Sequence, residues 1–228
     1  MGKMTLKTKL IVGGVVAAIL PLVVVGIFSI IKSSTALVSL AEGQAKLTAE
    51  NLATMVDLSM KQEVGKAEAM ASESFIREAA KGSGNEEALT AAEAYLAAVY
   101  KKIGENYEFF FVTDSSGQII ADSDYGKYRQ QNINVANRDY FQAAKSGKSI
   151  IGEPVISKAS GLPIVVVAVP LQDNSGLFAG VLGVNVKLTA LSEKITQVKM
   201  GETGYPFMVA KDGLFIAHPV KDYIFDLN

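Results

Sequence analysis

An uncharged apolar run near the N-terminus constrains this chain more than any other feature. From Leu10 to Ile31 the sequence contains no Asp, Glu, Lys or Arg. At about 1.5 Å per residue, a helix of this length crosses a hydrocarbon core of about 30 Å. A cleaved signal peptide is the alternative, with Ser34–Ala36 as a small-residue cleavage site, but its apolar core is usually much shorter. The run therefore predicts a retained transmembrane helix over residues 10–31.

Lysine placement predicts the orientation of this helix. Three lysines precede the run with no acidic residue among them, Lys3, Lys7 and Lys9, whereas only Lys32 follows it closely. Because lysine is enriched in cytoplasmic flanks, we expect residues 1–9 in the cytoplasm. The prediction is a protein of the plasma (inner) membrane whose remaining residues are extracytoplasmic.

Composition argues against several functional classes. The chain has no Cys, one His and a formal net charge of −1, so it predicts no disulfide framework, no cysteine metal site and no nucleic-acid partner. The single histidine, His218, has no obvious catalytic partner in the sequence. Asp122 and Asp124 can both face a cation, but they are more typical of a solvated strand end. We expect no catalytic residue, no metal site, no cofactor and no enzyme activity.

Helical sequence follows the apolar run. The stretch 33–80 lacks proline, is rich in Ala, Leu, Met, Glu and Lys, and predicts one long extracytoplasmic helix. Gly and Ser in 81–85 end it, and Glu86 to Ile103 predicts a second helix with an apolar face.

From Tyr107 onward the sequence consists of short runs rich in β-forming residues, separated by turn residues. A hairpin is predicted from 109–113 and 118–121, a short helix capped by Asn137 over 138–145, and further strands over 164–171 and 177–188. Thr189 is expected to cap a connecting helix toward Val198. This order predicts an α+β fold centred on an antiparallel sheet.

One hairpin pattern occurs twice. Phe111-Val112-Thr113, Gly117 and Ile120-Ala121 recur in register as Phe207-Met208-Val209, Gly213 and Ile216-Ala217, which indicates a duplicated module. We expect a first module over 81–188, and a linker helix with the start of a second module over 189–228. Since the second copy stops at Asn228, the chain is expected to be a fragment or an interrupted gene product.

Arg138 is the residue most typical of a binding site. It begins a short helix after a polar loop and is followed by Tyr140 and Phe141. A guanidinium there can hold a carboxylate at two points while the aromatic rings exclude water. A structural ion pair with Asp139 or Glu153 is the equal alternative.

These segments carry a resemblance. The membrane helix, the long helix and the runs FFFVTDSSGQIIADSD, NRDYFQAAKSGKSIIGEPVISKASGLPIVVVAVPL and GLFAGVLGVNVKL resemble the double Cache sensor domain. That resemblance implies two PAS-like modules on one long helix outside the cytoplasm, with a small ligand in the membrane-distal module. It also implies the input end of a methyl-accepting chemotaxis receptor.

The resemblance also suggests the site residues. Members that bind amino acids keep an arginine followed by two aromatics, matched here by Arg138, Tyr140 and Phe141. Ile133 and Val155 stand where tyrosines are expected, and Asn185 stands where an aspartate receives the ammonium group. Because Asn is neutral, we expect an organic acid or another small polar ligand rather than an amino acid. The candidate ligand-binding residues are Arg138, Tyr140, Phe141, Asp122 and Asn185.

The predicted function is therefore small-ligand sensing by a transmembrane chemoreceptor that forms a homodimer. Small residues four apart, such as Gly13 and Ala17, let two membrane helices approach closely. The alternatives are the sensor region of a histidine kinase or a diguanylate cyclase, and a membrane-tethered binding protein or enzyme without a signalling output.

Overall fold

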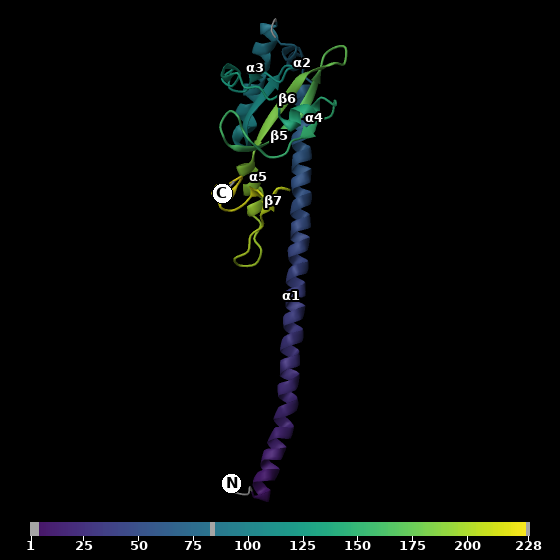
Figure 1. The fold of residues 1–228 in the computed structure, drawn as a ribbon, viewed down its shortest axis with the longest axis vertical. Coiled ribbons are helices and arrows are strands. Elements are labelled where there is room, and N and C mark those ends of the chain that lie inside the picture. The colour runs from purple at the N-terminus through teal and green to yellow at the C-terminus, as the bar shows by residue number, and fades with distance from the viewer. Residues whose placement is uncertain (1–4, 83–84, 227–228) are drawn as a thin grey trace. The chain divides into compact units, whose positions relative to one another are not determined.

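The computed structural model describes residues 5–82 and 85–226, and the chain divides into two compact units, Met1–Asn51 and Leu52–Asn228. Helix α1, Leu6–Ala71, belongs partly to each unit (Figure 1). The helix predicted over 10–31 and the start of the stalk predicted over 33–80 are therefore one uninterrupted element. Pro21 lies within it.

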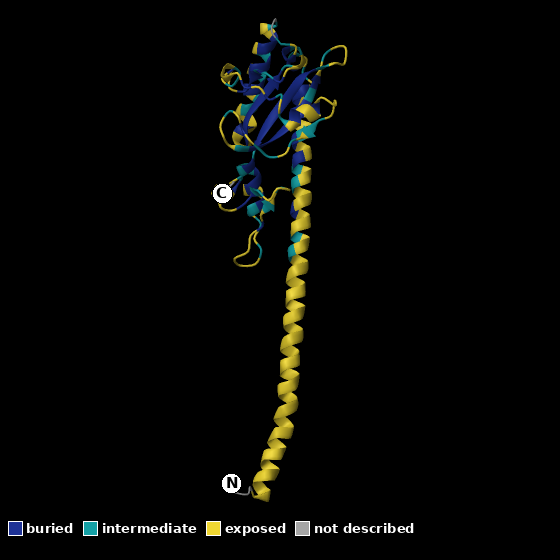
Figure 2. Ribbon diagram, in the orientation of Figure 1, coloured by how far each residue is buried: buried dark blue, intermediate teal, exposed yellow. Residues whose placement is uncertain are grey.

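In the first unit, α1 exposes nearly all of its side chains, as the yellow ribbon of Figure 2 shows. Its apolar residues are among the most exposed of the described chain, for example Leu22 at 72% and Ile30 at 70%. By length and composition, α1 is the one helix among the described residues that can cross a membrane. A helix that is apolar on every side and unburied is typical of a lipid-facing segment.

The predicted helix over 33–80 is broken in the structure. Helix α1 ends at Ala71, and α2, Ser74–Ala80, follows after a turn. Ser72 Oγ donates to Ala69 O at 2.6 Å, and Glu73 has an extended backbone with ψ of 132°. A serine side chain that bonds to a nearby carbonyl competes with the helical ladder, which explains the break.

Helix α3 matches its prediction, Glu86–Ile103. Asn85 Oδ1 accepts a hydrogen bond from Ala88 N at 3.1 Å, and Lys101 and Lys102 lie in the last turn, where the helix dipole favours positive charge. A short 3-10 turn, η1 (Gly104–Asn106), leads from α3 into the sheet.

The centre of the second unit is a six-stranded antiparallel sheet in the order β2-β1-β6-β5-β3, with β4 also paired to β5. Its strands are β1 (Tyr107–Thr113), β2 (Ile119–Asp122), β3 (Ile150–Ile151), β4 (Val155–Ile156), β5 (Pro163–Gln172) and β6 (Phe178–Lys187). Turns, η2 (Arg129–Gln131) and helix α4 (Asp139–Ala144) connect β2 to β3. The α+β class and the strands predicted from the sequence are confirmed.

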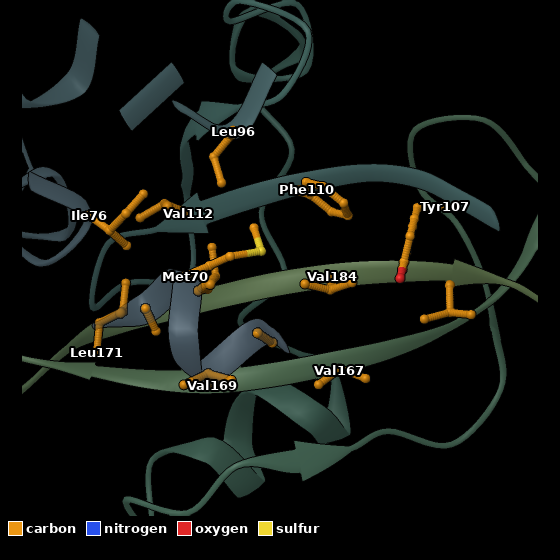
Figure 3. Packing of buried hydrophobic residues seen from close by; sticks show 14 of the residues in the cluster. Met70, Ile76, Leu96, Tyr107, Phe110, Val112, Val167, Val169, Leu171 and Val184 are labelled. Carbon is orange, nitrogen blue, oxygen red and sulfur yellow. The ribbon is translucent and has the colours of Figure 1, made fainter. Parts of the chain in front are cut away.

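The sheet separates two apolar clusters. On one side, called here the helix face, Tyr107, Phe110 and alternate residues of β5 and β6 pack against α2, α3 and the C-terminal part of α1 (Figure 3). On the other side, called the cavity face, Phe109, Phe111 and the intervening residues of β5 pack against α4 and the segment before it. Both faces are covered, so β5 and β6 read as almost continuous apolar runs.

The second hairpin is present as predicted. Strands β7 (Met208–Val209) and β8 (Phe215–Ala217) pair antiparallel, after helix α5 (Leu188–Thr196). Lys187, not Thr189, occupies the N-cap position of α5, because β6 continues to Lys187 and the helix begins at the next residue. A last 3-10 turn, η3 (Lys221–Tyr223), follows the hairpin.

Candidate ligand-binding site

A small cavity lies on the cavity face, beneath the start of α4. Its volume is about 20 Å³, which is room for about one water molecule. Its apolar lining includes Phe109, Phe111, Ile119, Ile133, Val135, Val155 and Ile164, and its polar lining consists of Arg138, Tyr140, Ser157, Lys158 and Asn185. Three of the five predicted site residues, Arg138, Tyr140 and Asn185, therefore meet at one place.

Arg138 occupies the N-cap position of α4 and is half-buried at the rim of the cavity. Its Nη2 donates to Ile156 O at 2.8 Å, which ties α4 to the edge of the sheet. Across residues 5–82 and 85–226, neither Asp139 nor Glu153 forms an ion pair with it. The structural ion-pair alternative is therefore wrong, and the guanidinium keeps donors for another group.

Lys158 brings a second cation to the same rim. Its Nζ donates to Asn134 O at 2.7 Å and to Asn137 Oδ1 at 2.8 Å. Because Asn137 Oδ1 is engaged by Lys158, it does not cap α4 as predicted. Partial desolvation, and then the charge of Arg138, lower the pKa of Lys158. A rim with two close cations favours an anionic ligand.

Tyr140 lies deeper and is 5% exposed. Its hydroxyl makes no hydrogen bond to any of the described residues, although it lines the cavity. Burial raises the pKa of Tyr140 well above its usual value, Arg138 opposes the rise, and Glu108 adds to it. The phenol therefore stays protonated and can donate to a group in the cavity.

The floor of the cavity contains a polar cluster that the sequence prediction missed in part. Asn185 Nδ2 donates to Glu108 Oε2 at 3.0 Å, and Ser157 Oγ donates to Glu108 Oε1 at 2.7 Å. All three residues are buried. The signal for Glu108 was available, because it is a charged residue inside the buried aromatic run of β1, where such residues are rare.

Apolar side chains make the rest of the wall. Ile133 and Val155 line the cavity at the positions where the resemblance expects tyrosines, so hydroxyl donors are absent from those two places. The ring of Phe111 lies directly over Gly183 of β6, where a Cβ atom would collide with it. The glycine thus allows the aromatic ring to close the cavity floor.

Phe141 and Asp122 do not line the cavity. Phe141 is fully buried in the apolar cluster of the cavity face and makes an edge contact with Phe178. Asp122 is also fully buried, and its carboxylate accepts hydrogen bonds from the backbone N–H groups of Asp124, Gly126, Tyr128 and Arg129 at 2.9–3.1 Å. These bonds use the carboxylate to organise the loop after β2, so the structure argues against Asp122 as a ligand residue.

A larger groove of about 690 Å³ lies elsewhere on the second unit and is lined by lysines of α1, α3, β6 and α5, namely Lys66, Lys101, Lys102, Lys187 and Lys194. Several of these groups are already engaged: Lys66 pairs with Glu63, and Lys187 donates to Glu105 O. We place the candidate site in the smaller cavity, because buried polar groups converge there. No cluster of three or more His, Cys, Asp or Glu that could hold a metal occurs in the described part of the chain.

Known proteins resemble this chain in both sequence and fold. Methyl-accepting chemotaxis protein McpB of Bacillus subtilis is 25% identical over 225 residues, which is 95% of this chain and 31% of McpB. The ligand-binding domain of the Pseudomonas fluorescens chemoreceptor CtaA, solved with L-serine, is 21% identical with a TM-score of 0.58, over 78% of this chain and 71% of that one. The sensor domain of the V. cholerae histidine kinase DctB is 18% identical with a TM-score of 0.58, over 66% and 57%.

These comparisons identify a family. The chain spans about a third of the length of the curated relatives that it matches over most of its own length. Residues 33–227 match the family model of the Cache domain, and the solved structures share its sheet fold. The resemblance inferred from the sequence is confirmed: this chain belongs to the Cache domain family.

Proposed function

We propose that this chain is the extracytoplasmic sensor region of a transmembrane chemoreceptor and that the cavity on the sheet binds a small carboxylate ligand. Membership of the Cache domain family and the methyl-accepting chemotaxis proteins among its relatives support the sensing role. The membrane-distal module would span residues 81–188, and residues 189–228 would form a linker helix and the start of a second module.

The observation that carries the ligand class is the pair of cations at the rim. Arg138 and Lys158 lie close enough for the charge of Arg138 to lower the pKa of Lys158. Both line the cavity, and the Tyr140 hydroxyl beside them is a further donor. A carboxylate accepts charge-assisted hydrogen bonds from such groups, and the guanidinium can bind it at two points.

The cavity must expand before it holds a ligand, because about 20 Å³ admits about one water molecule. The segment 157–162 is the wall best suited to move. It connects β4, a two-residue strand at the sheet edge, to β5, and Lys158, Ser160 and Leu162 in it are exposed. Its movement would break the hydrogen bonds of Ser157 and Lys158, and exposed edge segments of this kind open locally at lower free-energy cost than the central strands.

Binding to the full chain in lipid nanodiscs tests this proposal. Calorimetry with lactate, succinate and malate, and with the neutral analogue lactamide, should show binding of at least one carboxylate but not of the amide. Arg138→Gln should weaken that binding roughly tenfold or more, because a charge-assisted, two-point contact is lost. Arg77→Gln is the matched control, since Arg77 is an exposed arginine on α2 outside the cavity. Equal affinities of Arg138→Gln and wild type would contradict the site.

We also propose that the N-terminus is cytoplasmic and that two copies associate through the first unit. Lysines before the apolar run support the orientation, and exposed Leu40 and Leu47 recur seven residues apart on α1. Because the chain has no cysteine, single engineered cysteines give clean reporters. Leu40→Cys and Leu47→Cys should form disulfide-linked dimers, whereas Ala49→Cys, on the opposite side of the helix, should not.

Labelling with a membrane-impermeant thiol reagent tests the orientation. Lys148→Cys, in the exposed loop after α4, should react in intact cells, and Thr8→Cys should react only after the membrane is permeabilised. The reverse pattern would contradict the proposed orientation.

A histidine kinase sensor is the second candidate. The DctB sensor domain shares the fold at 18% identity, so the fold is compatible with this candidate as well. Output in a chimera tests the chemoreceptor candidate: the chain fused to a chemotaxis signalling domain should change swimming bias when the carboxylate identified above is added, and an unchanged bias despite binding would favour the kinase sensor.

A further inference from the structure

A β-bulge in β1 places the buried carboxylate of Glu108 behind the wall of the cavity. From Tyr107 to Phe110 strand β1 advances three residues, while its partner β6 advances two, from Val186 to Val184. Tyr107 and Phe110 belong to the helix face, and Phe109 belongs to the cavity face. The extra residue therefore places Glu108 beside Phe109 on the cavity face, against the simple alternation of a strand.

Glu108 is 7% exposed and has no cation at ion-pair distance within the described residues. Its two oxygens accept from Ser157 Oγ and Asn185 Nδ2, both of which line the cavity. A buried carboxylate held only by neutral donors leaves a negative charge directly behind the cavity wall.

This carboxylate also orients the amide of Asn185. A carboxylate only accepts hydrogen bonds, so it holds the NH2 group of Asn185 and turns Oδ1 away from itself. Asn185 is 3% exposed, and its Oδ1 accepts no hydrogen bond from any described residue. The floor therefore presents an unpaired acceptor backed by a negative charge, while the rim presents the donors Arg138 and Lys158.

We propose that Glu108, acting through Asn185, is a positioning residue that makes this cavity select carboxylates carrying a protonated amine over the matching hydroxy acids. This inference rests on the proposed carboxylate-binding function. The neutral Asn185 alone predicts an organic acid, but Glu108 restores the negative charge from the neighbouring strand. A hydroxyl group can donate to Oδ1 as well, yet only an ammonium group gains from the charge behind it.

Expansion of the cavity strengthens this preference. Movement of the segment 157–162 separates Ser157 from Glu108, because Ser157 Oγ is the link between that segment and the carboxylate. The released Oε1 is then a second acceptor on the cavity face, in addition to Asn185 Oδ1. An ammonium group has three donors and can satisfy both, whereas a hydroxyl has one.

The test compares matched ligand pairs on the full chain in nanodiscs: L-alanine with L-lactate, L-serine with L-glycerate, and 4-aminobutyrate with 4-hydroxybutyrate. For at least one pair, the wild type should bind the amine roughly tenfold or more tightly. Glu108→Gln should bring the two affinities of that pair within about threefold, since the charge is removed. Glu105→Gln is the control, because it removes the same charge from an exposed position on η1.

The ratio within a pair distinguishes this role from a merely structural one, because a folding defect weakens both members together. If Glu108→Gln does not fold, Asn185→Leu removes the acceptor and should abolish the preference as well. A wild type that binds carboxylates without preferring the amine would overturn the inference and leave the proposed function standing. A preference retained in either variant would also overturn it. Failure of every carboxylate to bind would overturn the proposed function itself.

Discussion

The two faces of the sheet differ in how their buried polar groups are hydrogen-bonded. On the helix face, the Tyr107 hydroxyl donates to Glu63 Oε2 at 2.5 Å, and Lys66 Nζ donates to Glu63 Oε1 at 2.8 Å, so the polar groups between β1 and α1 are paired. On the cavity face, Asn185 Oδ1 is buried without a hydrogen-bond partner among the described residues, and Tyr140 lines the cavity beside it. Glu93 Oε1 of α3 also accepts no hydrogen bond from the described residues, but Arg129 Nε lies 3.4 Å from it, whereas Asn185 Oδ1 has no such cation. A buried neutral acceptor without a partner costs free energy, and its position beside the cavity supports that face as the ligand-binding side.

The largest expected change in stability comes from removing a large buried side chain from the helix face. Phe110 is 1% exposed and lies in the cluster shown in Figure 3. Its ring makes edge contacts with the rings of Tyr100 and Tyr107. Phe110→Ala should lower the free energy of unfolding by about 3–5 kcal/mol, because a large cavity replaces the ring. Urea denaturation followed by circular dichroism measures it. The folded fraction should bind ligand as tightly as wild type.

Phe207→Ala is the matched control, since Phe207 is 57% exposed before β7. Its cost should stay below about 1 kcal/mol. An equal loss in both variants would mean that burial on the helix face does not determine stability.

Much of this contrast between faces follows from the sequence. The apolar, β-branched runs of β5 and β6 predict the strands, and the end of α3 and the hairpin turn at Gly117 follow from local rules. The break after Ala71 does not, because it coincides with a single side-chain bond, from Ser72 Oγ to Ala69 O, in a stretch that otherwise favours a helix. Hydrophobic periodicity can be recognised within a short stretch of sequence. A serine side chain, in contrast, can bond to any of several nearby backbone groups, so its hydrogen bond is not predictable from that pattern.

The candidate site was harder to predict. Arg138 and Tyr140 were recognised because a short motif carries them. Glu108 was missed because a bulge in β1 changes which face its side chain occupies, and nothing in the residues of β1 alone marks the bulge. Ser157 and Lys158 reach the cavity from a loop whose position depends on the whole sheet edge.

Asp122 is a buried polar residue whose two carboxylate oxygens both accept hydrogen bonds within the protein, unlike Asn185 Oδ1 at the cavity. Asp122→Asn should lower the free energy of unfolding by about 2–3 kcal/mol, since an amide can no longer accept from all four backbone N–H groups of the loop. Asp124→Asn, which affects the exposed pair with Lys127, should cost less than about 0.5 kcal/mol. Thermal denaturation measures both. A larger loss of ligand affinity than of stability in Asp122→Asn would return Asp122 to the binding site.

Two tyrosines offer the same chemical change on opposite faces. Tyr107→Phe should cost about 1–2 kcal/mol, because Glu63 loses a buried donor. Tyr140→Phe should change stability by less than about 0.5 kcal/mol at neutral pH, since its hydroxyl bonds to none of the described residues, but should weaken carboxylate binding severalfold. Denaturant titration and calorimetry on both variants measure the contrast. Equal stabilities would remove the distinction between the faces.

The last prediction concerns how the free energy of unfolding changes at alkaline pH, to which the same two tyrosines contribute. Their titration has no effect on stability near neutral pH. Burial is the first cause of the raised pKa of both Tyr140 and Tyr107, and Glu63 is the second cause for Tyr107. A tyrosine whose pKa is raised by folding contributes stability that is complete below its unfolded pKa of about 10 and is lost as pH rises above it. The unfolded chain then releases a proton that the folded chain keeps, so each such tyrosine lowers the free energy of unfolding by up to about 1.4 kcal/mol per pH unit. Tyr140→Phe should therefore lose less stability than wild type between about pH 10 and 11. If the Tyr140→Phe and wild-type profiles coincide over that range, the Tyr140 hydroxyl is not desolvated and the cavity face is open to water.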